Sequence, residues 1–283
     1  MKRMHRYWLA IVPAAGALGC TGTVASSSLD AEAATTTSAI VVVERTSDPS
    51  QGAHAEGSAR FVRVAAPATV DDALRAIGAA LELPARGTCA SVRTLAGVSA
   101  PSEVSPIVEL VDVGAVSLET NGVETRLMPR QLPDVTDVVT GLVYARASEP
   151  SLLPAAAKYV LHVAGGVGVA PFDAVATAPE DPASIRLAGE DERTGVVVSA
   201  PAVELTWTED GADDVVYVDV RPSGVRCVFG DGGRSSLPAA LLEDAGTLVL
   251  HRLRREALGV VAAGTDSGEI RFDFARTVSY TRK

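Results

Sequence analysis

The segment AVSLETNGVETRL, residues 115–127, is the clearest structural signal in the chain. Two runs with the alternating apolar pattern of strands, AVSLE and VETRL, flank Asn121 and Gly122. Asn-Gly is the strongest short hairpin signal, because both central residues of this tight turn need a positive φ angle. The segment therefore predicts a β-hairpin, and the residues on both sides of it continue the pattern.

The chain after Pro106 predicts further strands. Runs of Val, Leu, Ile and aromatic residues are separated by turn residues, which is typical of short strands. The candidate strands of the first half are 107–112, 135–144, 159–163 and 172–176. Residues 179–182 form a boundary, and the candidate strands beyond it are 196–198, 203–208, 215–220, 225–229, 247–253 and 270–280.

Residues 38–100 predict two strands followed by one helix. The runs 39–44 and 61–64 indicate strands on either side of a loop at 47–57. Thr69 is a candidate helix N-cap, and apolar residues then recur at helical spacing up to Pro84, at Val70, Leu74, Ile77 and Leu81. We expect this helix to pack on the sheet, because its mainly acidic polar face does not suit an anionic lipid surface.

The two halves share ordered landmarks, which predicts a duplicated domain. The landmarks of the first half are Gly141–Tyr144, Ser151–Ala156, Val160–His162 and Phe172–Asp173. Those of the second half are Gly224–Cys227, Ser236–Ala240, Val249–His251 and Phe272–Asp273.

Two all-β units of this size predict a mainly β protein with two tandem β-sandwich domains, at 101–180 and 183–283. Residues 242–248, LEDAGTL, resemble the corner before the sixth strand of immunoglobulin-like domains, where Asp-x-Gly-x-Tyr is expected. Leu248 stands at the tyrosine position, and Tyr159 of the first half lacks the Asp-x-Gly. The resemblance implies immunoglobulin-like sandwiches, with residues 38–100 packing on the first. We expect Trp207 to be the large core residue of the second.

The N-terminus has the composition of a secretion signal. Lys2, Arg3 and Arg6 precede an apolar run at 7–18, which is shorter than the roughly 20 residues that a membrane-spanning helix needs. Ala17-Leu-Gly-Cys20 resembles the processing site of bacterial lipoproteins, although Ala17 stands where leucine is usual. The resemblance implies a signal peptide at 1–19 and a lipidated Cys20 with two or three acyl chains, which together hold a protein firmly on a membrane.

The residues after Cys20 predict a tether. Residues 20–37 are rich in Ser, Thr and Ala, and such a composition is typical of a flexible linker. Thr21 follows the cysteine in place of Asp, which in the Gram-negative pattern implies transfer to the outer membrane. An ordinary cleaved signal, cut at residues 31–33, is the alternative.

The charge of the chain disfavours nucleic acid as a partner. The formal net charge is −10, and removal of 1–19 takes away three basic residues and no acidic one. An acidic body repels phosphate backbones. The expected partners are therefore the membrane, through the lipid anchor, and an unidentified protein or glycan.

Cys89 and Cys227 are left once Cys20 is assigned to lipidation. In an oxidising compartment an even pair of this kind predicts a disulfide. Two buried free thiols are an equally natural alternative, because cysteine packs as a small apolar residue. Their wide separation gives no zinc-binding spacing.

Most enzyme motifs are missing from the sequence. It contains no Gly-x-Ser-x-Gly elbow, His-Glu-x-x-His, phosphate-binding loop or dinucleotide fingerprint. His54 lies in a polar stretch, and we expect His162 and His251 on the solvent faces of equivalent strands. The glycine-rich residues 165–168 have no helix behind them and predict a turn.

The sharpest polar cluster is EDGADD, residues 209–214. Calcium binds several hard oxygen ligands, so the weak metal candidates are Asp210, Asp213, Asp214 and Asp231. A solvated acidic hairpin tip is the alternative, and no cofactor is expected.

The sequence as a whole predicts a lipid-anchored envelope protein with a non-enzymatic structural, adhesive or binding role. The alternative is an envelope hydrolase that uses acidic residues on sandwich loops.

Overall fold

The computed structural model describes residues 34–48, 52–97, 108–132, 139–192, 196–198, 201–259 and 263–283. The signal peptide, Cys20 and most of the predicted tether lie outside these residues. The described residues form a mainly β body with one 14-stranded mixed sheet and one four-stranded sheet.

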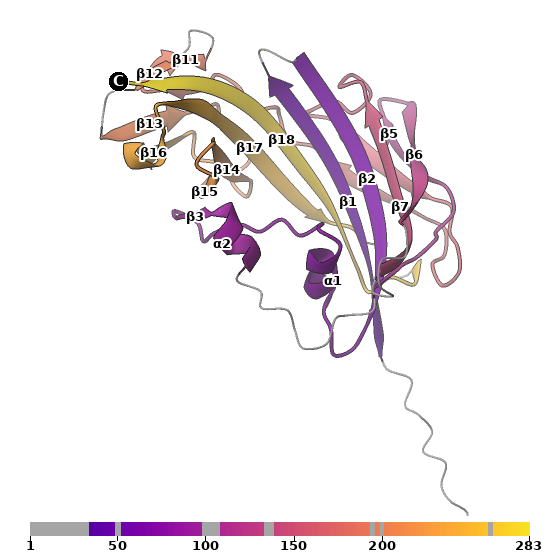
Figure 1. Cartoon of the computed structure of the whole chain (residues 1–283). Helices are drawn as coiled ribbons and strands as arrows, with labels where there is room; N and C mark the ends of the chain where they lie inside the picture. Colours follow the sequence, from indigo (N-terminus) through magenta and orange to yellow (C-terminus); the bar gives the residue numbers. More distant parts are fainter. Residues whose placement is uncertain are drawn as a thin grey trace, which may run out of the picture. The chain divides into compact units, whose positions relative to one another are not determined.

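Four long strands form the centre of the large sheet. They are β1 (Thr35–Asp48), β2 (Gly52–Ala65), β17 (Ala245–Ala257) and β18 (Ser267–Arg282). Figure 1 shows them side by side, in the order β17–β18–β1–β2. β1 runs antiparallel to β2 and parallel to β18, and in the parallel pair Ser38 lies opposite Ser267 and Ser47 opposite Arg276.

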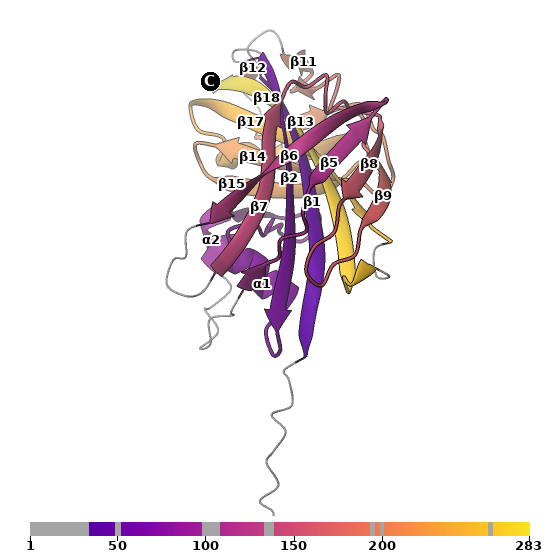
Figure 2. The ribbon, with the colours of Figure 1, turned by 90° about the vertical axis from the view of Figure 1, so that its right-hand side faces the viewer.

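Shorter strands extend this centre in both directions (Figure 2). On the β2 side the order continues through β4 (Val108–Leu110), β7 (Val139–Ser148), β6 (Val123–Leu132), β5 (Val116–Thr120), β8 (Lys158–Val163) and β9 (Phe172–Thr177). On the β17 side it continues through β14 (Val215–Arg221), β15 (Val225–Gly230) and β3 (Cys89–Ser91), while β12 (Val196–Val198) pairs with the end of β18.

The remaining elements are short. The four-stranded sheet has the order β11 (Glu190–Asp191), β10 (Arg186–Leu187), β13 (Ala202–Thr206) and β16 (Arg234–Pro238). The helices are α1 (Val70–Ala76), α2 (Val92–Gly97) and a 3-10 turn, η2 (Ala239–Leu241). No helix in the described part of the chain is long and apolar enough to cross a membrane.

The prediction of two tandem immunoglobulin-like sandwiches is wrong. β1 and β2, which the sequence placed in an accessory segment, lie between the strands of the two halves and join them into one sheet. Most of the loop predicted at 47–57 belongs to β2, which begins at Gly52. The error arose because local patterns identify strands but do not specify which distant strand each one pairs with.

Two apolar cores lie on the inner face of this sheet. In the first, Val41, Val43 and Phe272 of the central strands pack with residues of β5, β8 and β9, so the sheet folds back over itself. In the second, the four-stranded sheet covers β14, β17 and the end of β18. Trp207 is 5% exposed in this second core, which confirms its predicted role.

The Asn121-Gly122 hairpin is confirmed. β5 and β6 flank the turn, in which φ is 51° at Asn121 and 76° at Gly122. Gly141 on β7 meets a different constraint, because a Cβ atom there would lie 1.9 Å from the carbonyl oxygen of Leu110. The close pairing of β7 with β4 therefore needs glycine.

Two four-stranded units have the same antiparallel order, β6–β5–β8–β9 and β15–β14–β17–β18. His162 and His251 both lie on the third strand of their unit in chain order, β8 and β17. The landmarks Gly141–Tyr144 and Gly224–Cys227 do not correspond, because β7 is not the equivalent of β15 in this order. Duplication stays a prediction.

α1 begins as predicted. The Thr69 side chain accepts a hydrogen bond from the Asp72 backbone, and the Asp72 carboxylate accepts one from the Thr69 backbone, which completes a capping box. The helix is shorter than predicted, since it ends at Ala76. Leu74 and the following Ile77 pack on the outer face of β1 and β2, as expected for a sheet-packing helix.

Residues 78–88, which we call the crossing segment, link α1 to β3 over the outer face of the large sheet. Leu81 and Leu83 pack against Tyr217, Val228 and Leu253 there. At its far end β3 pairs with β15, where Cys89 lies opposite Cys227 and forms a disulfide with it. The predicted disulfide is therefore present, and it fixes the crossing segment to the β15 side of the sheet.

We expect replacement of both cysteines by alanine to lower the free energy of unfolding by about 2–5 kcal/mol, because the disulfide constrains a long loop of the unfolded chain. Its two cysteines are 138 residues apart. Chemical denaturation of the full chain with and without reductant measures this: reductant should destabilise the wild type and leave the double variant unchanged. Equal stability of all samples would contradict a stabilising role of the Cys89–Cys227 disulfide.

Candidate functional site

The outer face of the central strands carries a patterned set of charges. Side chains alternate between the two faces of a strand, and Val41, Val43 and Phe272 point into the core. The residues next to them along each strand, including Glu44 after Val43 and Asp273 after Phe272, therefore point outwards. Strand register arranges these outward residues in rows across β2, β1 and β18.

Three successive rows decide the chemistry of this face. The first contains Arg60, Ile40 and Glu269; the second Ser58, Val42 and Arg271; and the third Glu56, Glu44 and Asp273. Two rows thus contribute arginines, and the next contributes three carboxylates side by side. Like charges directly opposite each other destabilise a sheet, so the third row needs compensation.

Asp273 is compensated from the neighbouring strands. Its carboxylate accepts a hydrogen bond from the Tyr217 hydroxyl at 2.5 Å and contacts Nδ1 of His251 at 2.8 Å. The Tyr217 and His251 rings are stacked, with centroids 4.2 Å apart. Burial, followed by the charge of Asp273, raises the pKa of Tyr217 well above its usual value, so Tyr217 stays a hydrogen-bond donor.

The ion pair of Arg226 with Asp219 packs against the Tyr217 ring of this aromatic stack. Arg226 forms a two-pronged contact with Asp219, at 2.7 and 2.8 Å, and its guanidinium lies 4.7 Å from the centroid of the Tyr217 ring. Nη1 of Arg226 also donates to the carbonyl of Glu82 in the crossing segment. The network therefore links the sheet to the segment that covers it.

Both nitrogens of His251 are withdrawn from solvent. Nδ1 is engaged by Asp273, while Nε2 is buried, lies 3.9 Å from Asp219 and makes no hydrogen bond to the described residues. The His251 side chain is 15% exposed, so the prediction of a solvent-facing histidine is wrong here. His162 is different: its side chain is 35% exposed and lies between Asp173 and Glu119.

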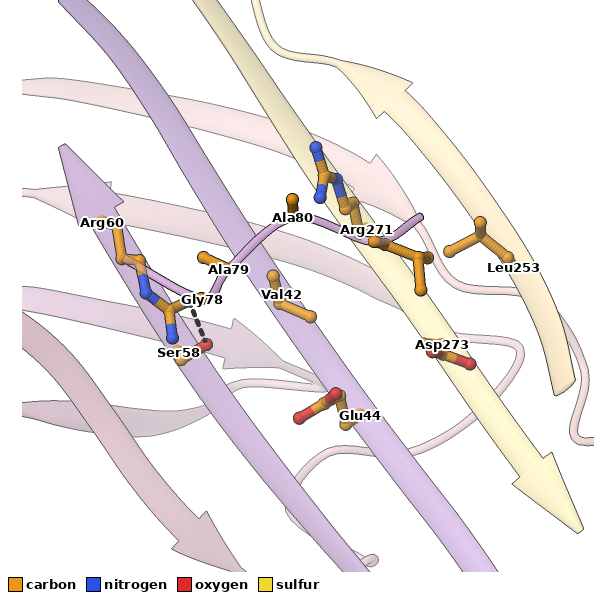
Figure 3. A pocket seen from close by; sticks show the side chains of 11 residues that line it. Val42, Glu44, Ser58, Arg60, Gly78, Ala79, Ala80, Leu253, Arg271 and Asp273 are labelled. Atoms are coloured by element: carbon orange, nitrogen blue, oxygen red, sulfur yellow. Dashed lines mark hydrogen bonds between the residues drawn. The ribbon is translucent and has the colours of Figure 1, made fainter. Parts of the chain in front are cut away.

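A cavity of about 200 Å³ opens between these rows and the crossing segment. It is lined by side chains of β1, β2, β17 and β18 and by residues 78–81, and we call it the polar recess. Figure 3 shows Arg60 and Arg271 on opposite sides of the chain from Gly78 to Ala80, with Glu44 and Asp273 further along the strands. A second hollow of about 180 Å³ shares Glu44 and Asp273 with the recess and includes His54.

Arg60 and Glu44 are the unpaired charges of the polar recess. The Arg60 guanidinium makes one long contact, 3.4 Å, to the Ser58 hydroxyl, and no carboxylate of the described residues forms an ion pair with it. Burial lowers the pKa of Arg60. Arg271, in contrast, is 8% exposed and its Nε contacts Glu269.

The acidic neighbours of Glu44 affect its pKa. Burial raises the pKa of Glu44, and the charges of Asp273 and Glu56 raise it further. Its carboxylate has no hydrogen bond or ion pair with a described residue.

The predicted calcium residues are placed differently. Asp231 is buried with Arg252, at 2.9 Å, and accepts a hydrogen bond from Nε1 of Trp207 at 2.6 Å. Arg254 contacts both Asp214, at 2.7 Å, and Asp210, at 3.0 Å. Among the described residues no group of three or more His, Cys, Asp or Glu side chains could hold a metal ion. Asp231 therefore forms an ion pair with Arg252, and Asp210 and Asp214 with Arg254, both arginines of β17. Asp213 is exposed beside them.

Four lining residues of the polar recess were not predicted from the sequence: Glu44, Arg60, Arg271 and Asp273. A signal was present, because Glu44 follows the apolar run IVVV and Asp273 stands between two phenylalanines. A charge inside an apolar strand indicates that one strand face meets water or a ligand. Only the pairing of β1 with β18 brings these two acids together.

We expect Glu44→Gln to stabilise the protein by about 0.5 kcal/mol at neutral pH, the scale of an unfavourable cross-strand pair. A carboxyl whose pKa is raised by folding stabilises the folded state while protonated, and this contribution is lost as pH rises through the raised pKa. The gain of the variant should therefore be largest above this pKa and vanish in acid. Urea unfolding from pH 4 to pH 8 measures it, with Glu204→Gln, an exposed glutamate opposite Ser236, as the control. A variant that is less stable at pH 8 would contradict the account.

No protein-family model matches this chain, and no curated protein matches it either.

Proposed function

We propose that the protein is a lipid-anchored protein of the bacterial cell envelope with a non-enzymatic binding role, and that the polar recess is its binding site. The observation that carries the binding role is a cavity of about 200 Å³ lined by four charged side chains, of which Arg60 and Glu44 form no ion pair with a described residue. Ligand sites typically combine an apolar lining with a few polar groups of this kind.

Two features support the envelope location. The sequence Ala17-Leu-Gly-Cys20 resembles a lipoprotein processing site behind a short apolar run. The Cys89–Cys227 disulfide is a feature of oxidising compartments, and it supports an extracytoplasmic site, though only weakly. On this proposal the lipid holds the protein on the outer membrane. The predicted tether, residues 20–37, links Cys20 to the β body, in which its last residues, 35–37, belong to β1.

The contacts of His251 and of the acidic loop residues support binding over catalysis. A general base must offer a free nitrogen or oxygen within reach of the substrate. His251 offers neither nitrogen, because one is held by Asp273 and the other is buried. The acidic loop residues on which a hydrolase would depend, Asp210 and Asp214, are paired with Arg254.

Labelling of growing cells with palmitate tests the anchor. We expect the wild type to be labelled and recovered in the outer membrane, while Cys20→Ser is unlabelled and released from the membrane. Thr21→Asp is the matched control, since it keeps the cysteine and should retain the label while the protein stays in the inner membrane. A Cys20→Ser variant that remained labelled and membrane-bound would contradict the lipoprotein proposal.

A further inference from the structure

Two opposite charges line the polar recess without pairing with each other. Arg60 on β2 contacts only the Ser58 hydroxyl among the described residues, and Glu44 on β1 has neither a hydrogen bond nor an ion pair there. Arg60 is half-buried, and a charge withdrawn from water is costly unless it is paired, whereas Glu44 is exposed. Two other arginines of this face have acidic partners, in the pairs Arg226–Asp219 and Arg271–Glu269.

The strand register explains why Arg60 and Glu44 stay apart. Arg60 lies opposite Ile40, and Glu44 is four residues further along β1. At about 3.3 Å per residue their backbones are about 13 Å apart. The Arg60 side chain leans towards Ser58, in the row between them, and Figure 3 shows both charged groups facing the same recess.

A second guanidinium, that of Arg271, lines the recess on the opposite side of residues 78–80 from Arg60. Arg271 lines it opposite Val42, close enough that its charge contributes to the effect on Arg60. Guanidinium groups bind carboxylates by paired hydrogen bonds. The negative side, formed by Glu44 with Asp273 opposite it, suits an ammonium group instead.

Apolar side chains, together with the Ser58 hydroxyl, line the space between the two charged sides. Val42 forms its floor, Leu253 its side and residues 79–81 (Ala-Ala-Leu) its cover. This lining suits a short aliphatic chain. The crossing segment that supplies the cover is held in place by α1 at one end and by the Cys89–Cys227 disulfide at the other.

We propose that the polar recess binds a small zwitterion whose carboxylate and ammonium groups are separated by a short aliphatic chain. Arg60 binds the carboxylate, and Glu44 binds the ammonium group. This inference rests on the proposed binding function and specifies its ligand class. Because the two charged residues lie in different rows, the ligand has to be longer than an α-amino acid.

Isothermal titration calorimetry of the full-length protein in detergent, at pH 7.5, tests the proposal with 6-aminohexanoate as the probe. We expect saturable binding that is at least tenfold tighter than that of hexanoate or hexylammonium, each of which carries only one of the two charges. Glycine, which is too short to reach both residues, should bind at least tenfold more weakly than 6-aminohexanoate. Absence of binding up to 10 mM, or equal affinity for the single-charge analogues, would overturn the proposal.

Two variants assign the contacts. Arg60→Gln should abolish the advantage of 6-aminohexanoate over hexylammonium, and Glu44→Gln its advantage over hexanoate. The matched controls Arg130→Gln and Glu204→Gln change exposed residues of β6 and β13 and should leave the affinities unchanged. Thermal unfolding of every variant, followed by circular dichroism, verifies that it is folded. Folded Arg60→Gln and Glu44→Gln variants with wild-type affinities would overturn the assignment.

Failure of this inference is distinguishable from failure of the proposed function. Palmitate labelling and membrane recovery depend on Cys20 and not on the recess, so Arg60→Gln should leave both unchanged. A protein that is anchored through Cys20 but does not bind the zwitterion would overturn the ligand class alone.

Discussion

The parallel pairing of β1 with β18 is the interaction on which the rest of this structure depends. Ten consecutive residue pairs, from Ser38–Ser267 to Ser47–Arg276, join a strand near the start of the described chain to its last strand. This pairing places the β6–β5–β8–β9 unit and the β15–β14–β17–β18 unit in one sheet. Without it β1 and β18 would each expose an edge of unpaired backbone groups in the middle of the sheet, a feature that proteins generally avoid.

The same register sets the chemistry of the outer face. Val41, Val43, Phe272 and Phe274 are fully buried in the inner core. Their positions leave Glu44 and Asp273 opposite each other on the outer face. A shift of one residue in either strand would exchange the two faces of that strand. The core therefore fixes the position of the charged rows, and the polar recess follows from the packing of residues that do not line it.

The local elements were predictable from the sequence because their signals are local. The Asn121-Gly122 turn, the Thr69 cap and the buried Trp207 each depend on a few neighbouring residues or on side-chain type. The disulfide was predicted as one of two alternatives, and the structure contains it. The sheet was not predictable in this way, since β1 and β18 are more than 200 residues apart and no local pattern names the partner of a strand.

The site residues were missed for the same reason. Glu44 and Asp273 each looked like a single charge in an apolar strand. The three-carboxylate row exists only after β1 pairs both with its neighbour β2 and with the distant strand β18. The acidic loop at 209–214 attracted attention because its charges are adjacent in sequence. In the structure Asp210 and Asp214 bind Arg254, so proximity in sequence indicated a structural network and not a ligand site.

Hydrogen–deuterium exchange with mass spectrometry tests the central claim, the β1–β18 pairing, most directly. Peptides that cover β1 and β18 should be protected to the same degree and should lose protection in a single transition as denaturant is added, because one sheet contains both strands. Rapid exchange in β1 beside a protected β18, or separate transitions for the two strands, would contradict the account.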